Sequence, residues 1–323
     1  MAFLLALLLS FVPCFGYAAI VYWLDRFEKE PAKLLFGAFL WGALVATGGA
    51  IIWTSVLQLG IGLLVGDGLA DLAGTTLLAP VVEELLKGLA IALIFLIVPH
   101  EFDSILDGMV YAAITALGFA ATENLLYLYF MGYLEGGYGE MFTLFLLRVV
   151  LGGWGHAVYT ASIGIGFAVG RLRRGRGSKL IFPFIGLMVA IFLHALHNGM
   201  ATFLAGTAGL GGLAAMLLVD WLGWAVALGV IIWAIRREQR WMREQLREEV
   251  ALGTISEEHY RTACSIMDRG RARLRSSAAR RFYAACANLA QKKQQLASLG
   301  EERGNSARIA ALRETVARLA PEV

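Results

Sequence analysis

The sequence predicts an all-α polytopic membrane protein, with a bundle of about seven transmembrane helices and a small helical cytoplasmic tail. Of the 323 residues, 58% are hydrophobic and only 16% are charged, and the mean hydropathy is +0.66. Ordinary soluble domains are less apolar than this. Seven apolar stretches are long enough to cross a bilayer as helices, and none alternates polar and apolar residues as barrel strands do. They lie near residues 2–24, 33–58, 75–98, 107–131, 142–170, 180–203 and 213–235.

The first and fifth stretches have features of their own. The first, Met1 to Leu24, has the position of a signal peptide, but it lacks a basic start and its apolar core is too long. We therefore expect a retained span. The fifth stretch is rich in glycine, and small residues let membrane helices pack closely. These glycines predict close helix contacts, and helix flexibility near a site is the alternative: Gly152, Gly153, Gly155, Gly164, Gly166 and Gly170.

The basic residues predict how the helices are oriented. Basic segments follow the first, fifth and seventh stretches, as "DRFEKEPAK", "RLRRGRGSK" and "RREQRWMREQLR", whereas the segments after the second, fourth and sixth contain no Lys or Arg. Because Lys and Arg favour the cytoplasmic side, we expect an N-terminus outside and a C-terminus in the cytoplasm of a multi-pass plasma or inner membrane protein. We interpret the basic loops as topology signals that face the anionic lipid of the bilayer. The sequence contains no nucleic-acid module and no nucleotide-binding motif, so no nucleic acid partner is expected.

The chain divides into a predicted membrane core over 1–235 and a basic, water-facing tail over 236–323. In the tail, Ser256 precedes two glutamates and suits a helix N-cap. We expect a solvated helical hairpin there; the alternative is a binding site for a cytoplasmic regulator, which no motif supports. One apolar seam predicts helix packing: Ile309, Leu312, Val316 and Leu319. The cysteines are too widely spaced for a disulfide framework: Cys14, Cys264 and Cys286.

Ionisable side chains interrupt the third apolar stretch. Glu83, Glu84 and Lys87 lie within it, and each such group near a bilayer centre costs about 2.5–3.5 kcal/mol. At a rise of about 1.5 Å per residue, the two glutamates lie about 12–14 Å below the outer face. Polar side chains from three other stretches fall in the same broad layer, mostly in the outer half of the membrane: Glu123, His156, His194 and His197.

Unpaired charges are prohibitive in lipid, so these groups must face one another or a water-filled cavity. Lys87 is spaced i,i+4 from Glu83 and i,i+3 from Glu84, so it can neutralise one carboxylate. Two further polar residues are interpreted differently. Arg148 is placed near the outer boundary, where it can snorkel. Asp220, about 10 Å below the outer face, has no companion in its own helix and is placed at the interface.

The residue types in this layer are those of hydrolytic chemistry. Carboxylates and imidazoles in a partly desolvated cavity can deprotonate water, and imidazole or amide groups can donate to a developing oxyanion. The same side chains suit Zn²⁺. The predicted reaction is attack of water on an acyl bond, with metal participation open. The alternative is an ion- or proton-coupled transporter that uses the buried Glu/His cluster, although the internal repeats of many transporters are absent from the sequence.

Four motifs, each on its own apolar stretch, resemble the PrsW family of intramembrane proteases over about residues 17–203. They are "EELLK" at Glu83–Lys87, "GFAATEN" at Gly118–Asn124, "GHAVYT" at Gly155–Thr160 and "HALHNG" at His194–Gly199, with "YWLDRFEKEP" at Tyr22–Pro31 and "DGMVYAAITALGFA" at Asp107–Ala120 in addition. The family is distantly similar to the CAAX prenyl protease/Abi group of glutamate-type intramembrane proteases. That group has His after Phe-x-x-x, where this chain has Glu123.

The resemblance implies an intramembrane endopeptidase and assigns roles by motif. Glu83 would be the general base on water, with Glu84 in support and Lys87 neutralising or orienting the pair. His194 and Asn198 would polarise the scissile carbonyl or hold a metal.

The resemblance leaves the metal open, because the family is commonly described as metalloprotease while the distant relatives argue for direct glutamate catalysis. Glu123 would position water or a metal, and Zn²⁺ is the candidate ion. The implied substrate is a single-pass membrane protein, anti-sigma-factor-like, cut near its extracytoplasmic side. The candidate metal ligands are His156, His194, His197 and Glu123.

Overall fold

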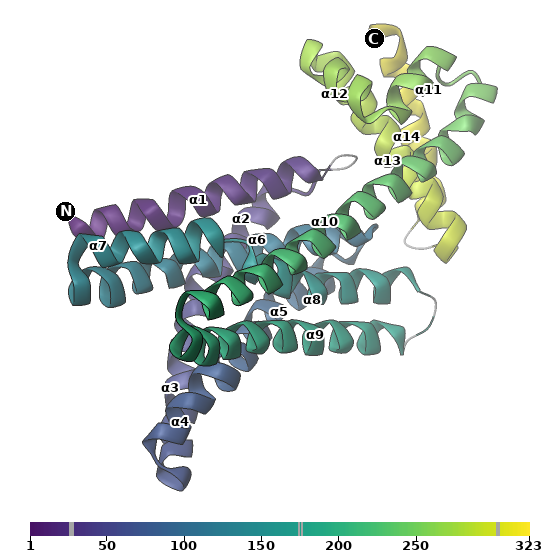
Figure 1. The fold of residues 1–323 in the computed structure, drawn as a ribbon. Coiled ribbons are helices and arrows are strands. Elements are labelled where there is room, and N and C mark those ends of the chain that lie inside the picture. The colour runs from purple at the N-terminus through teal and green to yellow at the C-terminus, as the bar shows by residue number, and fades with distance from the viewer. Residues whose placement is uncertain (26–28, 174, 176, 302–303) are drawn as a thin grey trace. The chain divides into compact units, whose positions relative to one another are not determined.

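The computed structural model describes residues 1–25, 29–173, 175, 177–301 and 304–323, and the regular structure in these ranges is helical. Parts of the "YWLDRFEKEP" segment and of the basic loop after the fifth stretch lie outside the described residues. Figure 1 shows the order of the elements. They are α1 (Ala2–Leu24), α2 (Ala32–Leu40), η1 (Trp41–Ala46), α3 (Thr47–Val65), α4 (Asp67–Ala73), η2 (Gly74–Leu78), α5 (Ala79–Ile97), η3 (Pro99–Glu101), α6 (Ile105–Leu126), η4 (Tyr127–Tyr133), α7 (Leu134–Leu144), η5 (Phe145–Leu151), α8 (Gly155–Leu172), α9 (Ser178–Met200), η6 (Ala201–Ala205), α10 (Gly206–Ala251), α11 (Glu257–Cys264), α12 (Ile266–Arg275), α13 (Ser277–Leu299), α14 (Asn305–Leu319) and η7 (Ala320–Glu322).

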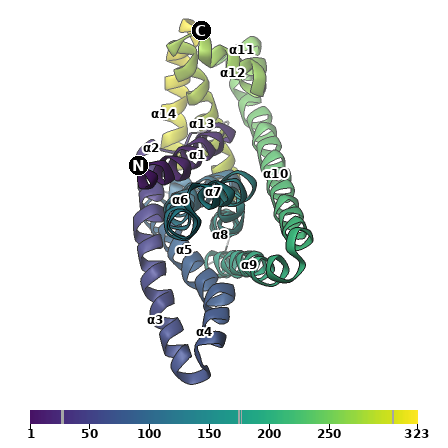
Figure 2. The same ribbon diagram turned by 60° about the vertical axis from the view of Figure 1, so that its left-hand side comes forward.

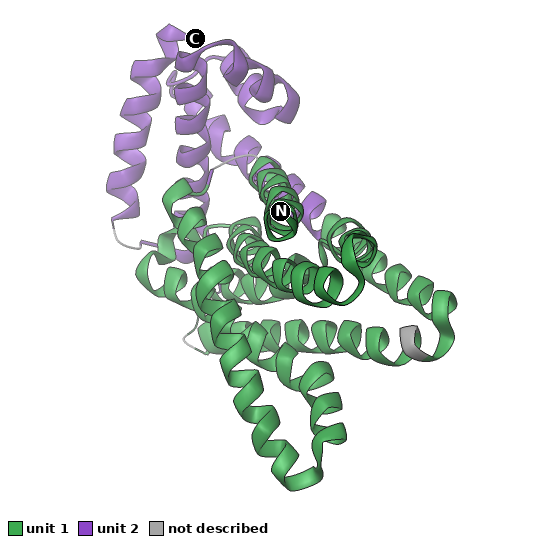
Figure 3. Cartoon of the chain, turned by 90° about the vertical axis from the view of Figure 1, so that its left-hand side faces the viewer, with its two compact units in different colours: residues 1–24, 30–171, 175–229 green, residues 25–29, 172–174, 230–323 purple. Residues whose placement is uncertain are grey.

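The chain forms two compact units, coloured separately in Figure 3. The first comprises residues 1–24, 30–171 and 175–229, and the second comprises residues 25–29, 172–174 and 230–323. Helix α10 contributes residues to both.

Five helical stretches among the described residues are long and apolar enough to cross a membrane. They are Ala2–Leu24, Ala32–Val65, Ile105–Leu172, Ser178–Leu204 and Thr207–Ala251. The all-helical membrane architecture is therefore as predicted, whereas the count of seven spans is not confirmed. Two predicted stretches, 107–131 and 142–170, fall within Ile105–Leu172, and the helix α5 carries three charged side chains and is not among the five.

The predicted fifth span is not one continuous helix. The backbone leaves helical conformation at residues 152–154, between η5 and α8. Two consecutive glycines, Gly152 and Gly153, lie at this break, and glycine is the residue that most weakens a helix interior after proline. The break lets α8 begin afresh at Gly155, one residue before His156.

Helix α6 is the centre of the first unit. Nearly every residue from Ile105 to Ala121 is buried, as expected for a helix that is apolar on all sides. It begins with a capping box, in which the Ser104 hydroxyl accepts from the Asp107 backbone N–H at 3.3 Å and the Asp107 carboxylate accepts from the Ser104 backbone N–H at 2.6 Å. These bonds satisfy backbone donors that the helix itself leaves free.

Close glycine contacts join α6 to α8. A Cβ atom on Gly164 would lie 1.9 Å from the carbonyl oxygen of Gly108, and one on Gly108 would lie 2.2 Å from the carbonyl oxygen of Gly164. The two backbones approach so closely that no side chain fits at either position. This contact agrees with the packing role expected for the glycines of the fifth stretch.

A helical hairpin, α3 followed by α4, precedes α5 in the first unit (Figure 2). The chain turns at Gly66, whose φ of 87° lies in the left-handed region. The side-chain amide of Gln58 on α3 donates to the Asp71 carboxylate on α4 at 2.6 Å. The hairpin leads into the π-helical segment η2, which is followed directly by α5.

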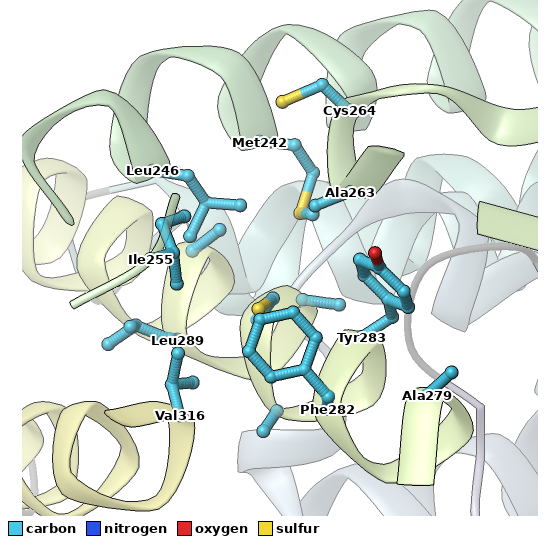
Figure 4. Packing of buried hydrophobic residues seen from close by; sticks show 14 of the residues in the cluster. Met242, Leu246, Ile255, Ala263, Cys264, Ala279, Phe282, Tyr283, Leu289 and Val316 are labelled. Carbon is cyan, nitrogen blue, oxygen red and sulfur yellow. The ribbon is translucent and has the colours of Figure 1, made fainter. Parts of the chain in front are cut away.

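The second unit is a helical bundle with an apolar core of its own (Figure 4). Leu246, Phe282, Cys286 and Leu289 are fully buried there. The N-cap predicted at Ser256 is confirmed, because its hydroxyl accepts from the His259 backbone N–H at 3.1 Å. The predicted seam on α14 also packs against this core. All three cysteines are free and buried, as expected.

Candidate active site

The first unit contains a polar cavity of about 510 Å³. Its walls come from α3, η2, α5, α6, η4, α7, η5, α8, α9, η6 and α10. Six of the residues predicted from sequence line it: Glu83, Glu123, His156, His194, His197 and Asn198. The cavity supplies the protein-lined surroundings that buried charged groups need in a membrane.

The Lys87 ammonium lies at the centre of the charged groups and is fully buried. Its Nζ atom is 2.9 Å from Glu84 Oε1, 3.3 Å from Glu83 Oε2 and 3.2 Å from His156 Nδ1. An ammonium has three N–H donors, so all three have an acceptor. Nζ also lies 3.9 Å from the centre of the Phe119 ring, on whose face a cation is favoured.

Glu84 is engaged on both carboxylate oxygens. Oε1 contacts Lys87 and lies 3.0 Å from His194 Nδ1. Oε2 accepts from the Thr160 hydroxyl at 2.8 Å. Glu84 is 0% exposed, so its carboxylate orients its neighbours and has no face toward the cavity.

Glu83 has a different environment, although it is the adjacent residue. It is 7% exposed and lines the cavity. Its Oε2 atom lies 3.3 Å from Lys87 Nζ and 3.7 Å from His194 Nε2. Of the two adjacent carboxylates, this is the one that water in the cavity can reach.

Glu123 joins a second group of contacts on the same wall. Its Oε2 atom is 2.9 Å from His156 Nε2 and 2.7 Å from the Arg148 guanidinium. Because Lys87 can only donate to His156 Nδ1, the hydrogen on that ring is at Nε2 and points to Glu123. Arg148 also bonds Asn124 Oδ1 at 3.2 Å, so it is a partner of the site and not a snorkelling residue at the boundary.

Three of these residues can form a metal site. Donor atoms of Glu83, His156 and His194 all lie within 4.8 Å of one another. Two imidazoles and a carboxylate are a common ligand set for catalytic zinc. Glu84 holds Nδ1 of His194 and leaves Nε2 available, which is the arrangement that usually orients a metal-binding histidine. The donor set therefore fits a metal, provided that His156 exchanges one of its two present contacts for the ion.

The remaining candidates lie elsewhere on the cavity wall. His197 is not part of the donor group; its Nδ1 lies 2.9 Å from Asp220 Oδ2. Asn198 donates its side-chain amide to the backbone carbonyl of Thr75 in η2 at 2.9 Å. The structure thus brings together the residues of the third, fourth, fifth and sixth stretches on one cavity, whereas His197 and Asn198 have their own partners, Asp220 and the Thr75 carbonyl.

The structure corrects the sequence interpretation of Asp220. Asp220 is only 6% exposed, and the Tyr159 hydroxyl donates to it at 3.1 Å. It therefore has companions on other helices, Tyr159 and His197. Tyr159 and Thr160 were not singled out either, although both fall in the quoted "GHAVYT" motif; the signal was their position one helical turn after His156.

Comparisons with known proteins agree with this geometry. Residues 30–243 match the model of a family described as PrsW family intramembrane metalloprotease. The curated relatives include a protein named Protease PrsW from Geobacillus kaustophilus (strain HTA426), 28% identical over 175 residues, which are 54% of this chain and 69% of the relative. Another Protease PrsW, from Clostridioides difficile (strain 630), is 25% identical over 175 residues with the same coverage. No solved structure matches the chain.

Proposed function

The chain belongs to the PrsW family of intramembrane metalloproteases, and from this premise we propose its substrate, mechanism and orientation. It is a multi-pass protease of the cell membrane. The proposed substrate is a single-pass membrane-anchored protein of the anti-sigma-factor kind, cut in or just beyond the extracytoplasmic end of its span. The proposed orientation has the N-terminus outside and the C-terminus in the cytoplasm. The comparisons do not favour a transporter.

The observation that carries the mechanism is the difference between the two adjacent glutamates. Glu83 reaches the cavity, whereas the Glu84 carboxylate is enclosed by Lys87, His194 and Thr160. A general base must be within reach of the proton that it takes. Glu83 is therefore the proposed base, which removes a proton from water as the water oxygen attacks the scissile carbonyl carbon. Glu84 keeps Lys87 and His194 in place.

Zinc is the proposed ion. In this metal-dependent alternative Glu83, His156 and His194 would hold the ion, with Glu83 as a ligand in place of its role as the base, and when bound the ion would supply Lewis acidity toward water and the scissile carbonyl. Glu123 and Arg148 fix one side of the His156 ring, and Glu84 fixes one side of the His194 ring. These contacts limit how far either imidazole can turn away from the cavity.

The zinc proposal predicts that His194→Ala lowers both bound zinc and peptide cleavage. The substitution removes one of the three proposed ligands, and the remaining two, Glu83 and His156, are too few to hold the ion. Zinc content of purified protein would be measured by elemental mass spectrometry, beside cleavage of a single-pass substrate with and without chelator. His100→Ala is the matched control, because His100 lies in η3 and does not line the cavity.

Full activity in zinc-free wild-type protein would contradict the proposed role of zinc and support a glutamate-only mechanism.

The tail, residues 236–323, has a proposed role of its own. We propose that the second unit bears on regulation, through a cytoplasmic partner, and not on the chemistry.

A further inference from the structure

A second cluster of buried polar groups lines the same cavity and has no part in the mechanism above. Asp220 on α10 accepts two hydrogen bonds, one from the Tyr159 hydroxyl at 3.1 Å and one from His197 Nδ1 at 2.9 Å. Asp220 is 6% exposed, whereas the His197 side chain is 24% exposed. Asp220, Tyr159 and His197 all line the cavity.

The roles of the two nitrogens of His197 follow from its partner. An ionised carboxylate only accepts, so Nδ1 of His197 carries the hydrogen in this contact. The other nitrogen, Nε2, is then free to exchange a proton at the cavity. A histidine held at Nδ1 by a buried carboxylate has a fixed ring orientation.

Peptide hydrolysis needs a proton at a second position. When the C–N bond breaks, the amine is a very poor leaving group unless its nitrogen receives a proton. Glu83 carries the proton taken from the attacking water and can release it again, and the His197 imidazole is a second acid–base group on the same cavity wall. The three N–H groups of Lys87 all have acceptors, and Glu84 has no face toward the cavity.

We propose that His197 donates the proton to the leaving amine and that Asp220 is the residue that positions it. The proposal rests on the protease function proposed above. In this step the Nε2–H bond of His197 breaks, an N–H bond forms on the amine, and the C–N bond of the substrate breaks. His197 then regains a proton from water in the cavity, and Glu83 returns to that water the proton it took.

Tyr159 links the proposed donor to the charged centre. Its ring is stacked on His194, with centroids 5.3 Å apart and planes inclined by 26°, and its centroid lies 5.9 Å from that of His197. Its hydroxyl is bound to Asp220. The Tyr159 side chain on α8 therefore packs against both the His194 ring, which lies beside Glu83, and the His197 ring, which lies beside Asp220.

The test compares two synthetic single-pass substrates that differ only in the scissile bond, one an amide and the other an ester. An ester loses an alkoxide, which leaves far more readily than an unprotonated amine and depends less on an acid. His197→Gln should lower amide cleavage by about 10²-fold or more, the usual contribution of a general acid, and should affect ester cleavage much less. Asp220→Asn should change the ratio in the same direction, and His100→Gln should leave both rates unchanged.

Each outcome bears on the proposal. A selective loss of amide cleavage in both variants supports the donor role. An equal loss on both substrates shows that His197 is only structural and overturns it, as does an unchanged amide rate. Glutamine keeps a polar group beside Asp220, and thermal unfolding of each variant in detergent separates misfolding from lost chemistry. If the wild-type protein cleaves neither substrate, the proposed function itself fails and the donor role with it.

Discussion

Glu83 and Glu84 follow each other in the chain, yet their carboxylates have different surroundings. One full turn of α5 places Lys87 between them, at 3.3 Å from the first and 2.9 Å from the second. Glu84 gains two further contacts, from His194 and Thr160, and is thereby fixed. Glu83 keeps its access to the cavity, which is what a base that acts on water requires.

This difference predicts distinct effects of the same substitution at the two positions. Glu83→Gln should lower the rate of cleavage by about 10²-fold or more, while the protein still accumulates and unfolds near its normal temperature. Glu84→Gln should lower thermal stability more than Glu83→Gln does, because the fully buried Glu84 carboxylate contacts Thr160 and His194 in addition to Lys87. Substrate cleavage and thermal unfolding in detergent would be measured for both variants. Near-normal cleavage in Glu83→Gln would move the base role to another carboxylate.

At the residue scale, sequence reasoning found the charged centre and missed its surroundings. Glu83, Lys87 and His194 stand out because ionisable groups are costly in an apolar helix. Asp220 was set aside because its own helix offers no partner, although its depth of about 10 Å matched that of His197 at about 9 Å. The usable signal was that Asp220 and His197, on different helices, have nearly the same predicted depth. The contact of Arg148 with Glu123 needs the packing of η5 against α6, which no local pattern encodes.

At the scale of elements, helix contacts in the first unit depend on glycine. Gly164 on α8 faces the Gly108 carbonyl with no room for a Cβ atom. Gly48 on α3 has nothing within 4 Å of the position where its Cβ would lie. The two glycines therefore provide a matched pair for the same substitution.

Gly164→Ala should destabilise the protein by about 1–3 kcal/mol, the usual cost of overpacking, and should reduce cleavage because α8 carries His156. Gly48→Ala should be neutral or stabilising by about 0.5–1 kcal/mol, because alanine favours the helix. Thermal unfolding of both variants in detergent is the measurement. Equal stability of the two variants would show that the α6–α8 contact tolerates a side chain.

The helical content could be predicted from composition, because a bilayer leaves backbone polar groups no partner but the helix itself. The helix boundaries could not be predicted as well. The break at residues 152–154 lies in an apolar stretch that is rich in glycine. Hydropathy does not distinguish a glycine that interrupts a helix from one that lets two helices pack closely. The α3–α4 hairpin was likewise not foreseen, since the residues of α3 up to Val65 are apolar enough to extend a span.

At the scale of the whole molecule, the proposed orientation can be tested without knowledge of the substrate. The positive-inside pattern predicts that reporters fused within residues 132–141, where α7 is kinked at Gly137, report an extracytoplasmic position, and that reporters fused at 171–179 or after residue 251 report a cytoplasmic one. Paired reporters, each active on one side only, would be used at every site. A cytoplasmic position of residues 132–141 would reverse the proposed side of cleavage.

We propose that the protein-lined, water-filled cavity around Glu83 hydrolyses a peptide bond of a membrane-anchored protein near the extracytoplasmic end of its span. A substrate helix must lose backbone hydrogen bonds before it can be cut, which is least costly near its end. The most direct measurement is product mapping by mass spectrometry, after purified wild-type protein or Glu83→Gln is incubated with a single-pass substrate. We expect one cut in or just beyond the extracytoplasmic end of the substrate span with the wild-type protein, and no product with the variant. A cut in the cytoplasmic third of the substrate helix, or equal product from both proteins, would contradict the account.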